Sequence, residues 1–166
     1  MFLNTSDILE GKFLNNSYSV VKSLPGQAKK SIQKNDILFS EIRPANKRFA
    51  FVHFNSEDYV VSTKLMVLRS KGFVDNLFTY FVLKSEDVLS QLQILAELRS
   101  GTFPQITYSE LDKIMVNIPN NDLLEKYTLF LWSIYNKIIE NEQQIRTLTQ
   151  LRDNLLPKLM SGQIAV

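Results

Sequence analysis

Two acidic residues and one lysine near the start of the chain have the types and spacing of a small metal site. Asp7, Glu10 and Lys12 lie close together in the sequence. The two carboxylates could hold a divalent metal ion, and the lysine could position a water molecule for phosphodiester cleavage. The simpler hypothesis is that Asp7 begins and Gly11 ends a short helical turn. We favour the helical turn, because residues this common reach such a spacing by chance.

Composition excludes most other catalytic chemistry. The chain has 166 residues, no Cys and one His, which excludes disulfides, thiol nucleophiles, thiolate metal sites and multi-histidine metal clusters. The sequence contains neither a G-x-x-x-x-G-K-[ST] loop nor a G-x-G-x-x-G segment that opens a helix after a strand. His53 alternates with apolar residues in a predicted strand, so we interpret it as structural. We therefore expect a protein that is not an enzyme and that holds no metal or cofactor.

Basic residues are concentrated in the first half of the chain. Residues 1–71 contain eleven Lys and Arg residues against six Asp and Glu residues, a net charge of +5, whereas residues 72–166 have a net charge of −3. The excess lies mainly between Lys22 and Arg48. A clustered basic surface attracts a phosphate backbone, because each neutralised phosphate releases counterions. The alternative is a solvated, lysine-rich surface with no partner.

Short strands and turns are predicted for this basic half. Runs rich in aromatic and β-branched residues predict strands at 18–21, 37–40, 48–54, 59–62 and 65–68. Turns are predicted at 25–26, 34–36, 43–46 and 55–58. These elements indicate a mixed or antiparallel sheet.

The pattern becomes helical near residue 75. Apolar stripes at 77–82 and 88–98 predict two short helices, the second with Ser85 as its N-cap. Ser109 and Asp112 indicate a capped helical turn, and residues 114–118 are a predicted strand that ends at Pro119. The globular domain is expected to end there.

Beyond Asn121, residues spaced alternately by three and four form what we call the heptad seam. Its positions are Leu124, Tyr127, Leu131, Ile134, Ile138, Asn141, Ile145, Leu148, Arg152, Leu155 and Leu159, and nine of these eleven are apolar. A helix over residues 122–154 would extend about 50 Å, so part of it should project from so small a domain. The exposed seam would then pack on a helix of another molecule. The alternative is a helix that lies across its own sheet.

No apolar run is long enough for a membrane span, and the first ten residues lack the pattern of a signal peptide. We expect a soluble cytoplasmic protein that binds no membrane.

Four segments in order carry a family resemblance. They are Leu3-Asn-Thr-Ser-Asp-Ile-Leu-Glu-Gly11, Lys34 to Pro44, Ser100-Gly-Thr-Phe-Pro-Gln-Ile106 with Leu111 to Pro119, and Ile138 to Gly162. Together they resemble the DNA specificity subunit of type I restriction-modification enzymes. The resemblance implies a target recognition domain that reads half of a bipartite DNA site. It also implies a long helix that acts as a spacer and docks methyltransferase (M) subunits, with restriction (R) subunits joining the complex. A full subunit contains this unit twice, so one copy is expected to be a half or an N-terminally truncated subunit.

The predicted fold is therefore α+β. Residues 1–119 form a β-rich, mixed-sheet recognition domain with short helices, and residues 120–166 form a long coiled-coil-type helix for dimerisation and methyltransferase docking. The family architecture implies that two copies pair antiparallel as a homodimer. A non-DNA coiled-coil adaptor that presents its β domain to a protein is the alternative.

Candidate DNA contacts lie on or beside the predicted turns. Those expected to contact phosphates are Lys29, Lys30, Lys47 and Arg48. Those expected to reach base edges are Arg43, Asn46, Arg99, Thr102, Gln105 and Tyr108, because Arg suits guanine and Asn or Gln suits adenine. Arg43 could instead pair with Glu41, and Tyr108 could be a core residue.

Overall fold

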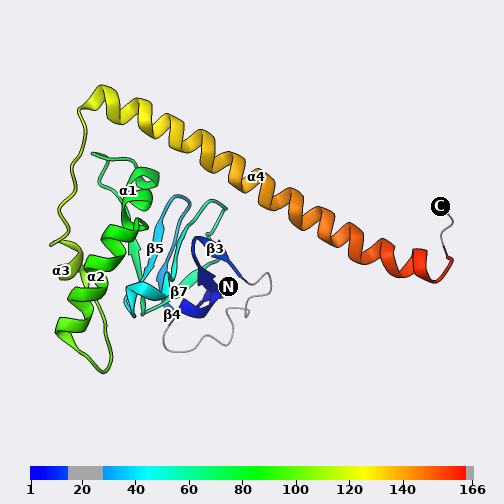
Figure 1. The fold of residues 1–166 in the computed structure, drawn as a ribbon, viewed down its shortest axis with the longest axis horizontal. Helices are drawn as coiled ribbons and strands as arrows, with labels where there is room; N and C mark the ends of the chain where they lie inside the picture. Colours follow the sequence, from blue (N-terminus) through cyan, green and yellow to red (C-terminus); the bar gives the residue numbers. More distant parts are fainter. Residues whose placement is uncertain (15–27, 164–166) are drawn as a thin grey trace. The chain divides into compact units, whose positions relative to one another are not determined.

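The structure, a computed structural model, describes residues 1–14 and 28–163. The chain divides into two compact units, Met1–Ile118 and Pro119–Val166 (Figure 1). The predicted strand at 18–21 and the predicted turn at 25–26 lie outside the described residues. None of the helices in the described ranges combines the length and the apolarity that a membrane span needs.

Three small sheets form the centre of the first unit. One has the order β1-β7-β4, with β1 parallel and β4 antiparallel to β7. The second is the antiparallel pair β2-β3, and the third is antiparallel with the order β6-β5-β8. The strands are β1 (Phe2–Leu3), β2 (Ile8–Leu9), β3 (Lys12–Phe13), β4 (Ala28–Ser31), β5 (Ile37–Ser40), β6 (Phe49–Phe51), β7 (Val60–Ser62) and β8 (Leu65–Leu68). The expectation of a mixed, β-rich unit is confirmed.

Strand β5 is central because the sequence makes it apolar on both faces. All four of its residues are buried, as expected for a strand covered on both sides. Leu38 lies opposite Ala50 on β6 and Val67 on β8, and Phe39 stacks on Phe49 with ring centroids 6.1 Å apart. One hydrophobic cluster joins the sheets, and its buried members are Leu3, Ile8, Ile32, Leu38, Ala50, Val52, Val61 and Leu65.

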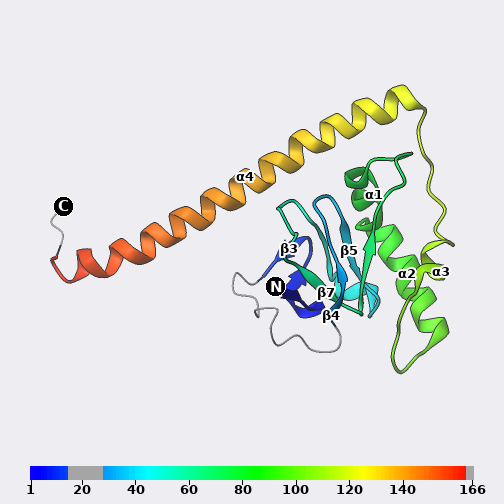
Figure 2. The ribbon, with the colours of Figure 1, turned by 180° about the vertical axis from the view of Figure 1, so that it is seen from behind.

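Helices α1 (Asn76–Leu83) and α2 (Glu86–Arg99) lie together on one side of the strands (Figures 1 and 2). Asp75 caps α1 by accepting from the Leu77 amide, and Ser85 caps α2 by accepting from the Val88 amide. The helix predictions and the Ser85 cap are thus confirmed. Helix α2 buries one apolar stripe, which consists of Val88, Leu89, Leu92 and Ala96.

Two short helical segments begin at caps other than those predicted. Thr107, and not Ser109, caps α3 (Tyr108–Leu111) in a capping box with Glu110. Asn4 caps the 3-10 helix η1 (Thr5–Asp7), so Asp7 ends that turn instead of beginning it. In both cases the observed cap stands three residues before an acidic residue that returns a hydrogen bond, which is the capping-box spacing.

Residues 114–118 form no strand, which corrects the prediction. Met115 is 91% exposed, and Val116 and Ile118 are also exposed. An apolar, β-branched composition favours a strand only where a neighbouring strand pairs with it. No strand in the described part of the chain pairs with this segment.

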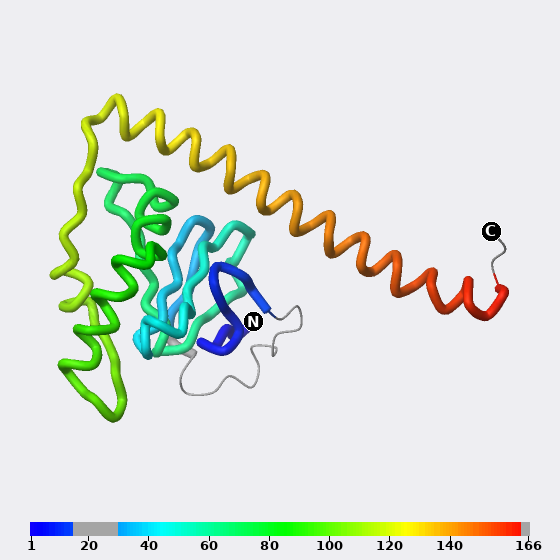
Figure 3. The backbone as a smooth tube through the Cα atoms, viewed as in Figure 1, coloured from blue at the N-terminus to red at the C-terminus, as the bar shows by residue number. Residues whose placement is uncertain are grey.

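The second unit is one long helix, α4 (Asn121–Met160), with Asn120 as its N-cap. Its 40 residues span about 60 Å. Figure 3 shows it as one uninterrupted helix, and the helix continues through Pro157. It ends at Met160, with Ser161 as the C-cap, and Gly162 then takes the left-handed conformation with φ +72° that commonly ends helices. The prediction of a long C-terminal helix is confirmed.

Candidate nucleic-acid interface

A tight turn between β5 and β6 carries two candidate base-reading residues, Arg43 and Asn46. It contains the 3-10 helix η3 (Pro44–Asn46), and the residues on either side of it, Arg43 and Lys47, have φ values of +43° and +53°. Such left-handed conformations cost about 1–3 kcal/mol each at non-glycine residues. We call residues 43–47 the strained turn. A turn of this kind persists only where neighbouring elements hold it.

The segment that contains Gln105 holds one end of the strained turn. The amide of Arg43 donates to the carbonyl of Pro104 at 3.1 Å, and the amide of Ile106 donates to the carbonyl of Glu41 at 2.8 Å. Ile42 and Gln105 form an isolated antiparallel bridge. The structure therefore places Gln105 beside the turn that carries Arg43 and Asn46, although the two segments are far apart in sequence.

Helix α2 and the β2–β3 hairpin hold the other end. The side-chain oxygen of Gln93 accepts from the Ala45 amide at 3.0 Å, and the amide of Glu10 donates to the carbonyl of Lys47 at 2.8 Å. The Lys47 ammonium group pairs with Glu86 at 2.5 Å and lies 4.0 Å from Glu10. Its hydrogen bond with Glu86 raises the pKa of Lys47 above the usual 10.5.

Three of the four candidate phosphate contacts also have partners within the chain. Lys30 donates to the carbonyls of Thr63 and Leu65, and Arg48 donates to those of Ser6 and Ile8. Lys47 pairs with Glu86, as described above. These bonds tie strands and loops together, so the three residues have a structural role that the sequence did not reveal. Lys29 lies in β4, and its contact with DNA, like that of the other three, stays a prediction.

The candidate base-reading residues fall into two groups. Arg99 pairs with Glu110 at 3.2 Å, and the side-chain oxygen of Gln105 accepts from Lys64 at 2.9 Å. The other four are exposed: Arg43, Asn46, Thr102 and Tyr108. Within the described ranges, no hydrogen bond or ion pair engages the side chain of Arg43 or Asn46.

Both alternatives considered for the base-reading residues are wrong. Arg43 does not pair with Glu41, which instead accepts from Lys64 at 3.4 Å and lies 4.0 Å from Lys30. Tyr108 is 50% exposed and is not a core residue. Residues 43, 46, 102 and 108 are therefore accessible to a partner.

Glu110 is the most perturbed carboxylate of this region. It accepts from the hydroxyl and the amide of Thr107, each at 2.6 Å, and from Ser109 and Arg99. These donors, chiefly the Thr107 hydroxyl, lower the pKa of Glu110 from its usual 4.5 to about 2. The resulting anion fixes α3 to the end of α2 at Arg99.

Asp7 and Glu10, the two carboxylates of the metal-site hypothesis, both have partners within the chain. Asp7 accepts from the Asn4 amide at 2.8 Å in the capping box, and Glu10 faces Lys47. Within the described ranges, no group of three or more His, Asp or Glu residues could hold a metal ion. Gly11 does not end a helical turn: it joins β2 to β3 with φ +88°, and a side chain there would overlap the Tyr80 hydroxyl.

His53 lies just after β6, because the strand predicted for 48–54 extends only over Phe49–Phe51. Its ring contacts those of Phe13 and Phe54 edge-on, with centroids 6.1 Å and 5.4 Å apart. The observed contacts agree with the structural interpretation of this residue.

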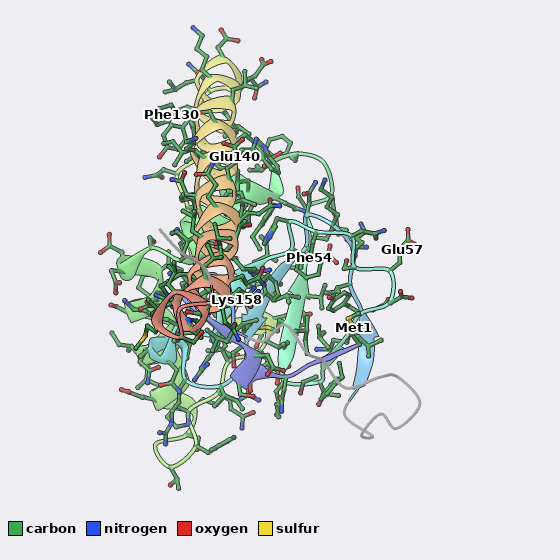
Figure 4. All side chains as sticks on the ribbon, turned by 90° about the vertical axis from the view of Figure 1, so that its right-hand side faces the viewer. Met1, Phe54, Glu57, Phe130, Glu140 and Lys158 are labelled. Atoms are coloured by element: carbon green, nitrogen blue, oxygen red, sulfur yellow. The ribbon has the colours of Figure 1, made fainter. Side chains whose placement is uncertain are left out.

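Most of the heptad seam on α4 is exposed. Ile145 and Leu148 are each 63% exposed, and Leu131 is buried. The remaining exposed apolar seam residues are Tyr127, Ile134, Ile138, Leu155 and Leu159; Asn141 is exposed and Leu124 is half-buried. Figure 4 shows the side chains along α4, among them Phe130, Glu140 and Lys158. So much exposed apolar surface on one helix is typical of an interaction surface.

Three residues that organise this region were not expected from the sequence: Gln93, Glu86 and Lys64. Each contacts a partner about 40 or more residues away, so no local pattern could have identified them. The only available signal was that all three are polar residues beside predicted apolar stripes or strands.

The fold is a β-rich unit with short helices, followed by one long helix. The family described as "Type I restriction modification DNA specificity domain" matches residues 3–150, which include parts of both units. The chain therefore belongs to this family.

Two relatives are named specificity subunits. The type I restriction enzyme HindI specificity subunit of Haemophilus influenzae is 43% identical over 156 residues, which is 93% of this chain and 34% of the relative. The MjaIX specificity subunit of Methanocaldococcus jannaschii is 24% identical over 166 residues, 99% of this chain and 34% of the relative. The chain thus spans about a third of the length of these relatives.

Two solved structures share the fold. One, described as the structural basis of complex assembly and conformational transition of the type I R-M system, has a TM-score of 0.67 at 22% identity and covers 99% of this chain. The HsdS subunit from Thermoanaerobacter tengcongensis has a TM-score of 0.66 at 21% identity and covers 97%. This chain covers 42% and 41% of the two solved chains.

Proposed function

We propose that the chain is a sequence-specific DNA recognition subunit, or half of one, in a type I restriction-modification system. It directs methyltransferase and restriction subunits to one part of a bipartite site. The observation that carries this proposal is the family match over residues 3–150. The matched residues cover the β-rich unit and most of the long helix, in the order that a specificity subunit requires. The 43% identity with a specificity subunit supports the same function.

In this proposal the first unit binds double-stranded DNA. The exposed side chains of Arg43, Asn46, Thr102 and Tyr108 read base edges, together with Gln105 and Arg99 beside them. The basic residues Lys29, Lys30, Lys47 and Arg48 contact phosphates, which position the protein without reading sequence. The chain itself catalyses no reaction and needs no cofactor, and the chemistry belongs to the subunits that it recruits.

The second unit serves assembly. The exposed seam of α4 supports pairing with another helix, and we propose an antiparallel homodimer in which two recognition units read a two-fold symmetric, interrupted site. The same helix docks methyltransferase subunits.

Selection of preferred duplexes from a random library, with the full chain and its methyltransferase subunit, tests the proposal. We expect one enriched sequence, and binding that falls steeply as salt concentration rises. Enrichment of no sequence would contradict the proposal.

A coiled-coil adaptor for a protein partner is the second candidate. The observation that favours it is that Lys30, Lys47 and Arg48 already have partners within the chain, which leaves fewer cations for phosphates. Salt dependence distinguishes the two functions, because an apolar protein interface responds weakly to salt whereas phosphate contacts respond strongly.

A further inference from the structure

The backbone of the strained turn is held from several sides. In contrast, the side chains of Arg43 and Asn46 have no hydrogen-bond or ion-pair partner among the described residues. Arg43 and Lys47 both have positive φ values, and Pro44 between them is buried. Within the turn, the amide of Asn46 donates to the Arg43 carbonyl at 2.8 Å and that of Lys47 to the Pro44 carbonyl at 2.9 Å. The turn therefore has its own hydrogen bonds but also stores conformational strain.

In the described part of the chain, one side chain from outside the turn bonds to its tip. The Ala45 amide donates to the side-chain oxygen of Gln93 on α2 at 3.0 Å. The amide nitrogen of Gln93 in turn donates to Glu97, one helical turn further along, at 2.7 Å. This second bond fixes which way the Gln93 amide points, so its oxygen faces the turn.

The groups that the turn presents have the chemistry of base recognition. Arg43 has a planar guanidinium group whose paired N–H donors match the O6 and N7 acceptors of guanine, and Asn46 has the donor and acceptor that match adenine. Both side chains are exposed. Such contacts discriminate between bases only if the side chains are held at a fixed position, since a mobile arginine contacts any phosphate equally well.

We propose that Gln93 is a positioning residue for sequence discrimination. It holds the strained turn through the Ala45 amide so that Arg43, with Asn46, is presented in one orientation to a base pair. The inference rests on the proposed function of DNA recognition and adds to it a residue that does not itself contact DNA. Loss of the Gln93 oxygen frees the Ala45 amide at the tip of the turn, so that Arg43 keeps its charge but is held less firmly in one direction.

The test uses the full chain and two duplexes: the sequence enriched by selection, called the selected duplex, and an unrelated sequence, called the unselected duplex. It measures the ratio of the dissociation constant for the unselected duplex to that for the selected duplex. Gln93→Met keeps the length of the side chain and removes the acceptor. We expect the ratio to fall by about 3–10-fold, while affinity for the unselected duplex, its salt dependence and the thermal unfolding midpoint stay at their original values. Arg43→Ala should lower the ratio by about 10-fold or more at one base pair, since each correct bidentate contact discriminates by that order.

Two further variants separate positioning from a general structural role. The double variant Gln93→Glu with Glu97→Gln exchanges the two groups, so that position 93 can still accept from the Ala45 amide and from the amide at position 97. This variant should restore the ratio. Gln91→Met, at an exposed position on the same helix, should leave the ratio unchanged.

The outcomes are distinguishable. If Arg43→Ala lowers the ratio and Gln93→Met does not, the role of Gln93 is overturned while DNA recognition stands. If Gln93→Met weakens binding to both duplexes equally, or if the exchanged pair does not restore the ratio, Gln93 has only a structural role and the inference is overturned. If the unmodified chain itself prefers no sequence, the proposed function fails, and the positioning role fails with it.

Discussion

The carboxylate of Asp36 accepts two parallel hydrogen bonds from the guanidinium group of Arg69, each 2.7 Å long. Asp36 is fully buried just before β5, and Arg69 follows β8 and is about half exposed. The carboxylate also accepts from the Gln33 amide at 2.8 Å. One buried anion thus fixes the turn before β5 to the end of the neighbouring strand.

Removal of Arg69 should destabilise the first unit. Arg69→Ala leaves a buried carboxylate without its cation, and the removal of one partner costs about 3–5 kcal/mol in buried pairs. Because Arg69 is half exposed, we expect a decrease of about 2–3 kcal/mol in the free energy of unfolding, measured by urea titration. Lys71→Ala, at an exposed position nearby, is the control and should change it by less than about 0.5 kcal/mol. Equal stability of the two variants would contradict the role given to this pair.

Acid should weaken the contact between α3 and α2 through Glu110. The pKa of Glu110 in the folded protein is about 2, below the usual 4.5, so the folded state favours the anion. The stabilisation is therefore fully present above pH 4.5 and disappears as pH falls from 4.5 towards 2. In that range the unfolded state binds up to one proton more than the folded state. The free energy of unfolding therefore falls by up to about 1.4 kcal/mol for each unit by which the pH decreases.

The measurement is the urea midpoint between about pH 5.5 and 3 for the unmodified chain and for Glu110→Gln. The variant should be less stable at the upper end of this range, and its stability should fall less steeply as pH decreases. Parallel pH profiles for the two proteins would show that Glu110 is not the titrating group.

Local patterns predicted helices α1 and α2 and strands β5 to β8, but they missed the short strands β1 to β4. The stripe from Val88 and the cap at Ser85 depend on residues within one or two helical turns, and α2 forms as predicted. Strand β1 has only two residues and exists because Phe2 and Leu3 pair with Val60 and Val61, far away in sequence. The strand prediction for residues 114–118 was wrong for the opposite reason. The composition of this segment favours a strand, but no strand in the described chain pairs with it.

The same distinction applies to the candidate site. Residue type and turn chemistry were enough to select Arg43 and Asn46, which are exposed on a turn as predicted. The partners of Lys47 and Gln105 are Glu86 and Lys64, and these pairs are 39 and 41 residues apart. Pairs at such separations are set by tertiary packing, so the structural roles of the basic residues were not accessible from the sequence.

The candidate phosphate contacts predict a sequence-independent decrease in affinity. Replacement of Lys29, Lys30, Lys47 and Arg48 by Ala should weaken binding to all duplexes alike. It should also reduce the salt slope by about 1 for each phosphate that the variant no longer neutralises. The measurement is fluorescence anisotropy at several salt concentrations, with circular dichroism to show that the variant is folded.

Glu86→Gln is the matched control for Lys47. It removes the charged partner of Lys47 but keeps the positive charge of the lysine, so a phosphate contact of Lys47 should persist or strengthen. If Lys47→Ala and Glu86→Gln weaken binding to the same extent, the ion pair matters to the fold and Lys47 does not contact phosphate. If the fourfold variant binds with an unchanged salt slope, the basic segment is only a solvated surface.

The heptad seam predicts self-association through α4. Ile138 and Ile145 are one heptad apart and are 41% and 63% exposed, so a second helix packed on the seam would cover both. Replacement of both by Asp would place unpaired charges in an apolar interface, which costs several kcal/mol and should yield a monomer. Sedimentation velocity over a range of concentrations gives the mass of each form, and thermal unfolding shows whether the β-rich unit is unchanged.

The matched control for this pair is Asn136→Asp with Gln143→Asp, which has the same spacing away from the seam. Because these positions would not face the partner helix, the control variant should leave the dimer intact. A wild-type chain that stays monomeric at the highest concentration, or an Ile-to-Asp pair that still dimerises, would exclude the seam as a self-association surface. The exposed apolar residues of α4 would then be available only for docking to a different subunit.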